Sequence, residues 1–257
     1  MGTTLRGRTI TGFLCTAAIA ASTLAVQAAD IKVLSAVGFR GVLSEAVPKF
    51  ERASGDRVRI TYGTLGQIMK RIEKGETADV IVLPRQGLDD LARQGKIGAS
   101  EITPIARSRV GMAVRKGLRK PDISTADGFR KALLEAKSVS TVDPGSGGVS
   151  ALHFRTLFER MAIAEQMRPK LRYRAAGTLR TVTAREDVAL NQMQDLVDAK
   201  GLVVVGPLPE ELQLKTVFAA AAASRAHGAA SRALVAYLGG PEAGAIARAK
   251  GLEPLAP

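Results

Sequence analysis

The feature that most constrains the fold of this chain is a short apolar strand pattern that ends in small residues and leads into a helix. Residues 31–34, which are apolar except for Lys32, have the length of a buried strand. Small residues follow at Ser35, Ala36 and Gly38, and apolar side chains then return at helical spacing over 42–50. In open α/β sheets, ligands bind where such strands end, and the N–H groups at the start of the helix favour an anion.

The same order recurs three times. Strand patterns at 58–62, 78–83 and 138–142 end in turns at 63–67, 84–85 and 143–150, and a helical pattern follows each turn. Strands that alternate with helices are typical of α/β proteins with parallel sheets. We therefore expect two α/β lobes whose turns face one cleft.

The remaining sequence continues this pattern. Strands are expected at 105–115, 202–205 and 216–222, a further helix within 178–193, and two C-terminal helices at 229–239 and 241–250. No repeat of 20–50 residues is visible in the sequence, which argues against a solenoid.

The first 28 residues have the pattern of a secretory signal peptide. Arg6 and Arg8 form a basic start, residues 10–26 are mostly apolar or small, and small residues suit cleavage near residue 28. An uncleaved membrane anchor and a lipoprotein attached through Cys15 are the alternatives. We expect cleavage and a periplasmic protein. Cleavage removes Cys15, the only cysteine, so the mature protein would hold no disulfide and no thiol nucleophile.

The net charge of +13 favours anionic ligands through long-range attraction. Nucleic acid is not an expected partner, because aromatic residues make up only 4% of the chain and lysines and arginines form no compact block. The spacing of His, Cys, Asp and Glu suggests no metal site, and no nucleophile with its base is visible. We expect no cofactor and no metal.

The glycine-rich turn at 145–150 is the strongest single candidate for a ligand site. Its glycines allow backbone N–H groups to converge on an anion at the start of a helix. The Gly-Lys-Ser/Thr of a nucleotide-binding P-loop is missing, so ATP binding is not expected. The candidate residues are Ser146, Gly147, Gly148 and Ser150. The alternative is a flexible loop in which Ser150 caps the helix.

Other candidates lie in or near turns predicted to face the cleft. Each of them also has a structural role as the alternative to ligand binding. A glycine can allow the backbone of a turn, a hydroxyl can cap a helix, an arginine can lie in solvent, and a buried amide can fix the position of a hinge. A lone histidine such as His153, one turn into its helix, is more often structural than a base. These candidates are Ser35, Gly38, Phe39, Arg40, Thr64, Leu65, Gly66, Arg85, Arg107, His153, Asn191 and Gln192.

Several segments together resemble the periplasmic molybdate-binding proteins of ABC importers. The matching segments are 33–36 with 38–43, 50–51, 54–55, 63–68, 78–80 and the tail 241–254. The resemblance covers essentially 30–257. It implies the type II periplasmic binding fold, an α/β fold of two lobes, each a mostly parallel sheet flanked by helices. It also implies a monomer that binds a small anion and delivers it to an ABC permease in the inner membrane.

The resemblance implies the division into lobes as well. Lobe 1 would comprise 30–107 and about 216–257, and lobe 2 would comprise 108–205. Crossovers would fall near 104–110 and 204–216, and the lobes would close over the ligand by a hinge motion.

Three positions depart from this family's ligand site. Gly38 and Leu65 stand where the family places serines, and Gln192 stands where it places a tyrosine. Ser35 and Thr64 can replace the missing hydroxyls only in part. Arg40, Arg85 and Arg107 carry forked donors that suit carboxylates. We therefore expect an organic carboxylate or another oxyanion, with molybdate or tungstate as the alternative ligand.

Two functions are compatible with these residues. The first is a periplasmic solute-binding protein that captures its ligand without chemistry, and we expect this one. The alternative is a carboxylate isomerase similar to aconitate isomerase, on the same scaffold. Such an enzyme needs a base to remove a proton next to a carboxylate, and His153 is the sequence candidate for it.

Overall fold

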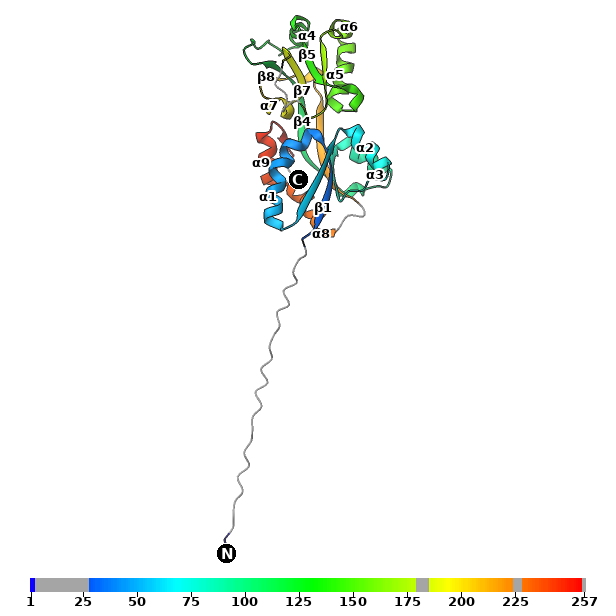
Figure 1. Cartoon of the computed structure of the whole chain (residues 1–257), viewed down its shortest axis with the longest axis vertical. Helices are drawn as coiled ribbons and strands as arrows, with labels where there is room; N and C mark the ends of the chain where they lie inside the picture. Colours follow the sequence, from blue (N-terminus) through cyan, green and yellow to red (C-terminus); the bar gives the residue numbers. More distant parts are fainter. Residues whose placement is uncertain (3–27, 179–184, 224–227, 256–257) are drawn as a thin grey trace.

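The computed structural model describes residues 1–2, 28–178, 185–223 and 228–255. Within these ranges the chain forms two parts, one above the other in Figure 1. Nearly all of the predicted signal peptide lies outside the described residues. The described residues contain no helix that is long and apolar enough to cross a membrane.

The lower part holds most of the N-terminal half and the C-terminal end of the chain (Figure 1). Its elements are β1 (Asp30–Ala36), the 3-10 turn η1 (Val37–Phe39), α1 (Arg40–Ser54), β2 (Arg57–Gly63), α2 (Leu65–Glu73), β3 (Val80–Pro84), α3 (Arg85–Arg93), η2 (Ala99–Glu101), β9 (Lys215–Ala222), α8 (Gly228–Gly239), α9 (Pro241–Ala249) and β10 (Glu253–Pro254).

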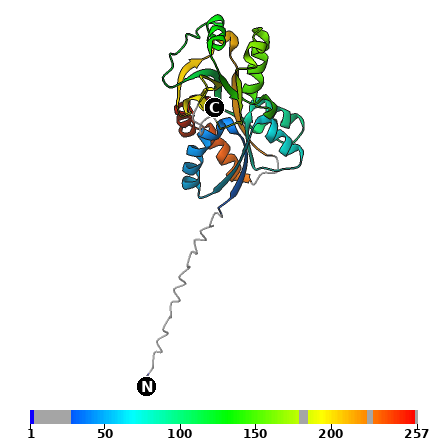
Figure 2. The same cartoon turned by 45° about the horizontal axis from the view of Figure 1, so that its top comes forward.

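The upper part holds the middle of the chain. Its elements are α4 (Ala126–Glu135), β5 (Val139–Val142), η3 (Pro144–Ser146), α5 (Val149–Arg160), α6 (Ala164–Met167), β6 (Leu171–Arg174), β7 (Val188–Gln192), α7 (Met193–Val197), β8 (Leu202–Pro207) and η4 (Glu210–Leu212). In both Figure 1 and Figure 2, α5 lies on the same side of the molecule as α2.

One strand, β4 (Ile102–Arg115), belongs to both parts. Its first half pairs with β9 and β10, and its second half pairs with β7 and β8. The strand order is β2-β1-β3-β9-β4-β7-β5-β6. Pairs among β1, β2 and β3, and among β5, β6 and β7, are parallel, whereas β9 and β4 run antiparallel to their neighbours. The predicted α/β class with parallel strands is confirmed.

The sequence predicts a helix within 178–193. Residues 179–184 of this segment lie outside the described residues, and for 188–192 the prediction is wrong, since these residues form strand β7, which pairs with β4 on one side and β5 on the other. All five residues are buried. The apolar residues of this short strand, 188–190, are consecutive, so the sequence shows no alternation that would distinguish the strand from a helix.

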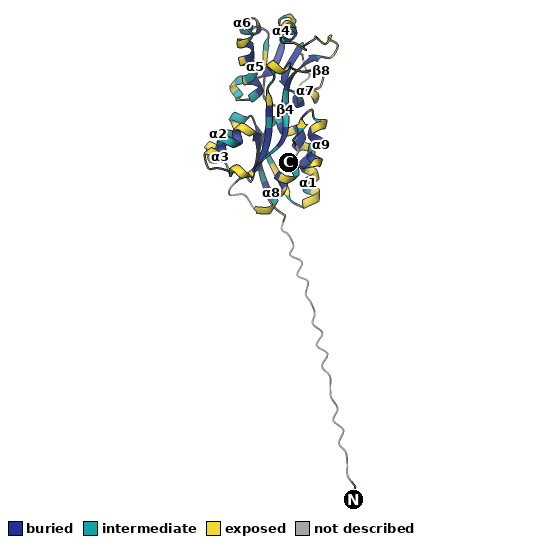
Figure 3. Ribbon diagram, turned by 180° about the vertical axis from the view of Figure 1, so that it is seen from behind, coloured by how far each residue is buried: buried dark blue, intermediate teal, exposed yellow. Residues whose placement is uncertain are grey.

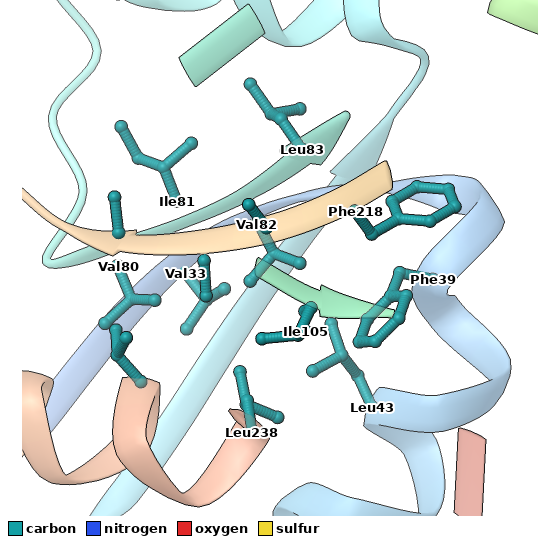
Figure 4. Packing of buried hydrophobic residues seen from close by; sticks show 14 of the residues in the cluster. Val33, Phe39, Leu43, Val80, Ile81, Val82, Leu83, Ile105, Phe218 and Leu238 are labelled. Atoms are coloured by element: carbon teal, nitrogen blue, oxygen red, sulfur yellow. The ribbon is translucent and has the colours of Figure 1, made fainter. Parts of the chain in front are cut away.

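Each of the two parts is built around a large hydrophobic core. In the lower core, Val33 and Val82 from the sheet pack with Leu43 and Leu238 from helices (Figure 4). The upper core includes Met112 and other side chains between β4 and the helices α4 and α5. Figure 3 shows the result: buried strands at the centre and exposed residues on the outer helix surfaces.

Candidate ligand-binding pocket

The carboxyl ends of parallel strands from both parts converge on one pocket. The lower part contributes residues that end or follow its parallel strands, namely Ala36, Val37, Gly38, Thr64, Leu65 and Pro84, together with Phe218 from within β9. The upper part contributes Val142, Gly148, Val149, Ser150, Ala176, Gly177, Asn191, Gln192 and Asp195. In open α/β sheets this edge is where ligands bind.

Two helices begin at this pocket from opposite sides. Leu65 starts α2 and Val149 starts α5, and both residues line the pocket. The N–H groups of a helix's first turn have no acceptor within the helix, and the helix dipole gives that end a partial positive charge. Two such ends directed at one pocket favour a negatively charged ligand.

Thr64 holds the start of α2 in place. Its hydroxyl accepts a hydrogen bond from the Gln67 N–H at 3.2 Å, while its own N–H donates to Gln67 Oε1 at 2.9 Å. The same hydroxyl donates to the carbonyl oxygen of Ser146 in the upper part. Thr64 therefore acts as a helix cap and as a contact between the two parts.

Glycines allow the two parts to touch beside the pocket. A Cβ on Gly147 would lie 3.1 Å from the Cα of Gly66. A Cβ on Gly177 would lie 2.4 Å from Val37 Cγ2, and both Gly147 and Gly177 have positive φ angles, of 69° and 78°. Side chains at these positions would push the turns apart.

The side-chain amides of Asn191 and Gln192, at the end of β7, line the pocket. Asn191 Oδ1 accepts hydrogen bonds from Ser150 Oγ at 3.2 Å and from the Gln192 N–H at 2.8 Å. Gln192 Oε1 accepts from Gln194 Nε2 at 2.8 Å. The Gln192 Nε2 group is buried and has no hydrogen-bond partner among the described residues. An unsatisfied buried donor costs free energy, so this amide is suited to hold an acceptor on a ligand.

Gln192 also explains the glycine in the first turn. A Cβ on Gly38 would lie 2.9 Å from Gln192 Oε1 and 3.3 Å from Gln194 Nε2. Gln194 Nε2 in turn donates to the Gly38 carbonyl at 3.2 Å, and Ser108 Oγ donates to Gln194 Oε1 at 2.6 Å. The amide side chains therefore occupy the space that a serine at position 38 would need.

Two residues of the first strand and turn lie away from the pocket. Ser35 is buried, and its Oγ donates to the Ala36 carbonyl at 3.1 Å. Phe39 is 1% exposed and packs against Phe218, with ring centroids 5.3 Å apart. Neither residue is among the described lining residues.

The three candidate arginines are placed differently. The Arg40 guanidinium lies over the Tyr62 ring, 4.5 Å from its centroid, and its Nη1 would be 4.0 Å from a Cβ on Gly177, a lining residue. Arg40 is therefore at the margin of the pocket. Arg85 pairs with Asp89 at 2.7 Å and Arg107 pairs with Glu253 at 3.3 Å. These two arginines do not line the pocket.

His153 also lies outside the lining. Its Nε2 is 2.9 Å from the Leu212 carbonyl oxygen, and burial lowers its pKa. In the glycine-rich turn, Ser146 Oγ donates to the Asp143 carbonyl at 2.7 Å. The structure thus brings Gly38, Thr64, Leu65, Gly148, Ser150, Asn191 and Gln192 together at the pocket.

Sequence reasoning missed Asp195. This carboxylate lies on α7, is 7% exposed and lines the pocket. The available signal was the group of four polar residues among 191–195, which comes directly after the apolar residues 188–190. Within the described ranges, no group of three or more His, Cys, Asp or Glu side chains is arranged to hold a metal ion.

The chain is similar to proteins of known function. The model of the family "bacterial extracellular solute-binding protein" matches residues 31–253. An aconitate isomerase from a Pseudomonas species is 33% identical over 233 residues, which are 88% of each chain. The molybdate-binding protein ModA of Escherichia coli (strain K12) is 23% identical over 234 residues, 89% of this chain and 90% of the other.

Solved structures show the same fold. The periplasmic molybdate-binding protein of Azotobacter vinelandii matches with a TM-score of 0.71 at 17% identity, over 88% of this chain and 99% of that one. At this identity the likeness concerns the fold alone. It confirms the predicted type II periplasmic binding fold.

Proposed function

Since this chain belongs to the bacterial extracellular solute-binding protein family, in its molybdate-binding-like branch, we propose that it captures a small organic polycarboxylate in the pocket between its two parts. The observation that carries this proposal is the buried Gln192 Nε2 group, which lacks an acceptor among the described residues. It lies at a pocket where the starts of α2 and α5 also favour negative charge.

Three features support a carboxylate over a tetrahedral oxyanion. Gly38 and Leu65 provide no side-chain hydroxyl. Arg40 at the margin offers a forked donor that suits a carboxylate group. Asp195 lines the pocket with a carboxylate, which offers no hydrogen-bond donor to a compact oxyanion. A longer acid can direct its carboxylates to the donors and its carbon chain toward Asp195.

We further propose that the pocket closes by movement of two lobes. Lobe 1 comprises 30–107 with about 216–257, lobe 2 comprises 108–205, and the crossovers lie near 104–110 and 204–216. Two contacts support the interpretation that this structure is the closed arrangement. Thr64 contacts Ser146, and Gly66 approaches Gly147. An ABC permease would then receive the ligand from a monomer in the periplasm. Mass spectrometry of the exported protein would detect whether residues 1–28 are removed.

Isomerisation of the bound carboxylate is the second candidate function. It is favoured by the 33% identity to an aconitate isomerase over 88% of each chain, which exceeds the 23% identity to the molybdate-binding protein. The scaffold would then hold the acid as a binding protein does, and one group of the pocket would move a proton.

Ligand binding is tested on the protein purified from the periplasm of an expression host. Thermal unfolding with citrate, cis-aconitate and trans-aconitate is compared with molybdate, tungstate, sulfate and phosphate. A ligand that binds only the folded protein, at a hundredfold excess over its Kd, stabilises it by about 2.7 kcal/mol. Stabilisation by the carboxylates is expected. Stabilisation by molybdate or tungstate alone would refute the proposed ligand class.

Gln192→Ala tests the donor that carries the proposal. Loss of a hydrogen bond to a charged group costs about 1.5–3 kcal/mol, so calorimetry should show an affinity at least tenfold weaker. Gln166→Ala is the matched control, because Gln166 is exposed on α6. An unchanged Kd for Gln192→Ala would remove the main support for this pocket.

A further inference from the structure

We propose that Asp195 is the catalytic base of this pocket and moves a proton along the carbon chain of a bound unsaturated polycarboxylate. The inference rests on the second candidate function, isomerisation. Asp195 is the only residue with an ionisable side chain among the described lining residues. It therefore differs from every other lining group, which can donate, accept or pack but not exchange a proton near neutral pH.

The position of Asp195 is fixed by its neighbours in sequence. It is the third residue of α7, which begins directly after β7. Gln194, one residue earlier, is held on two sides by the Gly38 carbonyl and by Ser108. Since these contacts join α7 to both the first turn and β4, the carboxylate is placed on a supported element. Support of this kind is what a catalytic group requires.

A buried carboxylate that lines an anion-binding pocket offers no hydrogen-bond donor to a ligand carboxylate. The groups from Gln192 and from the starts of α2 and α5, at the same pocket, do offer such donors. The two kinds of group together are the arrangement needed to hold a polyanion by its carboxylates while a base contacts its carbon chain.

The reaction is a proton shift within the substrate. In an acid with a methylene group between a carboxylate and a carbon–carbon double bond, Asp195 takes one methylene proton. The electron pair of the broken C–H bond forms a new double bond to the central carbon. The pair of the original double bond then takes the proton back from Asp195 at the far carbon. Substrate and product are isomers, Asp195 ends as it began, and no oxidant or cofactor is consumed.

The pocket's donors have a role in the same step. As the proton leaves, negative charge spreads onto the carboxylate next to the methylene carbon. The Gln192 amide and the N–H groups that begin α2 and α5 can donate to that carboxylate. Donors already oriented toward developing charge stabilise it without reorganisation.

The test follows cis- and trans-aconitate in D2O by proton NMR, with calorimetry on the same samples. The wild-type protein is expected to interconvert the isomers and to exchange their methylene protons for deuterium. Asp195→Asn should lower both rates at least 100-fold and leave the Kd within threefold or tighten it. Asp198→Asn is the control. Asp198 follows Asp195 by three residues but does not line the pocket, so this variant should keep the wild-type rates.

A second variant separates a base from a structural group. Asp195→Ala should regain several-fold of its lost exchange rate when formate is added, and chloride at the same ionic strength should have no effect. Asp195→Asn with wild-type rates, or loss of turnover in both variants without formate rescue, would overturn the inference. Wild-type protein that binds aconitate without isomerisation or exchange would overturn it too, while the solute-binding proposal would stand. Absence of binding would overturn both.

Discussion

Replacing Gly66 with alanine should weaken ligand binding and at the same time stabilise the ligand-free protein. Gly66 is the second residue of α2, and its φ angle is not in the left-handed region. Alanine is therefore compatible with the backbone, and in a helix it is favoured over glycine by roughly 0.5–1 kcal/mol. The three atoms nearest to the new methyl group all belong to the upper part.

Under the lobe closure proposed above, the cost arises only when the two parts meet. The added Cβ would lie 3.3 Å from Gly147 Cα and 3.5 Å from the Ser146 carbonyl oxygen. The Gly147 Cα at 3.3 Å must move by a few tenths of an ångström, and the Thr64 contact to Ser146 lies beside it. Overpacking usually costs about 1–3 kcal/mol. With the low end of that range, about 1 kcal/mol, the Kd should rise about fivefold.

Calorimetric titration gives the Kd, and scanning calorimetry gives the Tm without ligand. A gain of about 0.5–1 kcal/mol should raise the Tm by roughly 1–4 °C for a chain of this length. Gly244→Ala is the control, since Gly244 lies in α9 and its added Cβ would meet only Pro254, at an ordinary 3.4 Å. This control should raise the Tm and leave the Kd unchanged. A Gly66→Ala protein with the wild-type Kd would refute the role assigned to the glycine contact.

Two other substitutions test residues outside the pocket. Phe39→Ala should lower the free energy of unfolding by about 3–5 kcal/mol, because it removes a buried ring that packs on Phe218; urea titration measures this, and a loss below about 1 kcal/mol would contradict the packing. Burial lowers the pKa of His153 in the folded protein below its ordinary 6.5, so the unfolded chain binds a proton more readily. The free energy of unfolding should therefore fall as the pH drops from 7 toward 5. His153→Gln should reduce that fall. Urea titrations at several pH values measure the free energy of unfolding of both proteins, and the same dependence on pH in both would contradict the lowered pKa.

The fold was predictable because its evidence is local. An apolar run of four residues followed by small residues and a helical period indicates a strand, a turn and a helix without knowledge of the rest of the chain. The parallel strands β1, β2, β3 and β5 each lead into a helix, as the order of the patterns in the sequence predicts. The pocket lies where these strands end, so Gly38, Thr64 and Gly148 could be selected from sequence alone.

The side chains of the site were less predictable because their directions depend on distant residues. Arg85 and Arg107 occupy suitable turns or strand positions, but each is engaged by an acidic partner, and the partner of Arg107 is 146 residues away. Asp195 was missed because α7 is short and β7 was interpreted as part of a helix. The pairing of β7 with β4 that makes it a strand joins segments about 80 residues apart.

The continuity of β4 through both sheets has a mechanical consequence. A single strand of 14 residues carries β9 at one end and β7 with β8 at the other. Any rotation between the sheets must be absorbed as a change in the torsion angles of a few residues near 108–110 and of the neighbouring segment that leads from β8 into β9. The lobe closure proposed above would therefore bend these two connections, and a larger ligand in the pocket would stop that rotation at a wider angle.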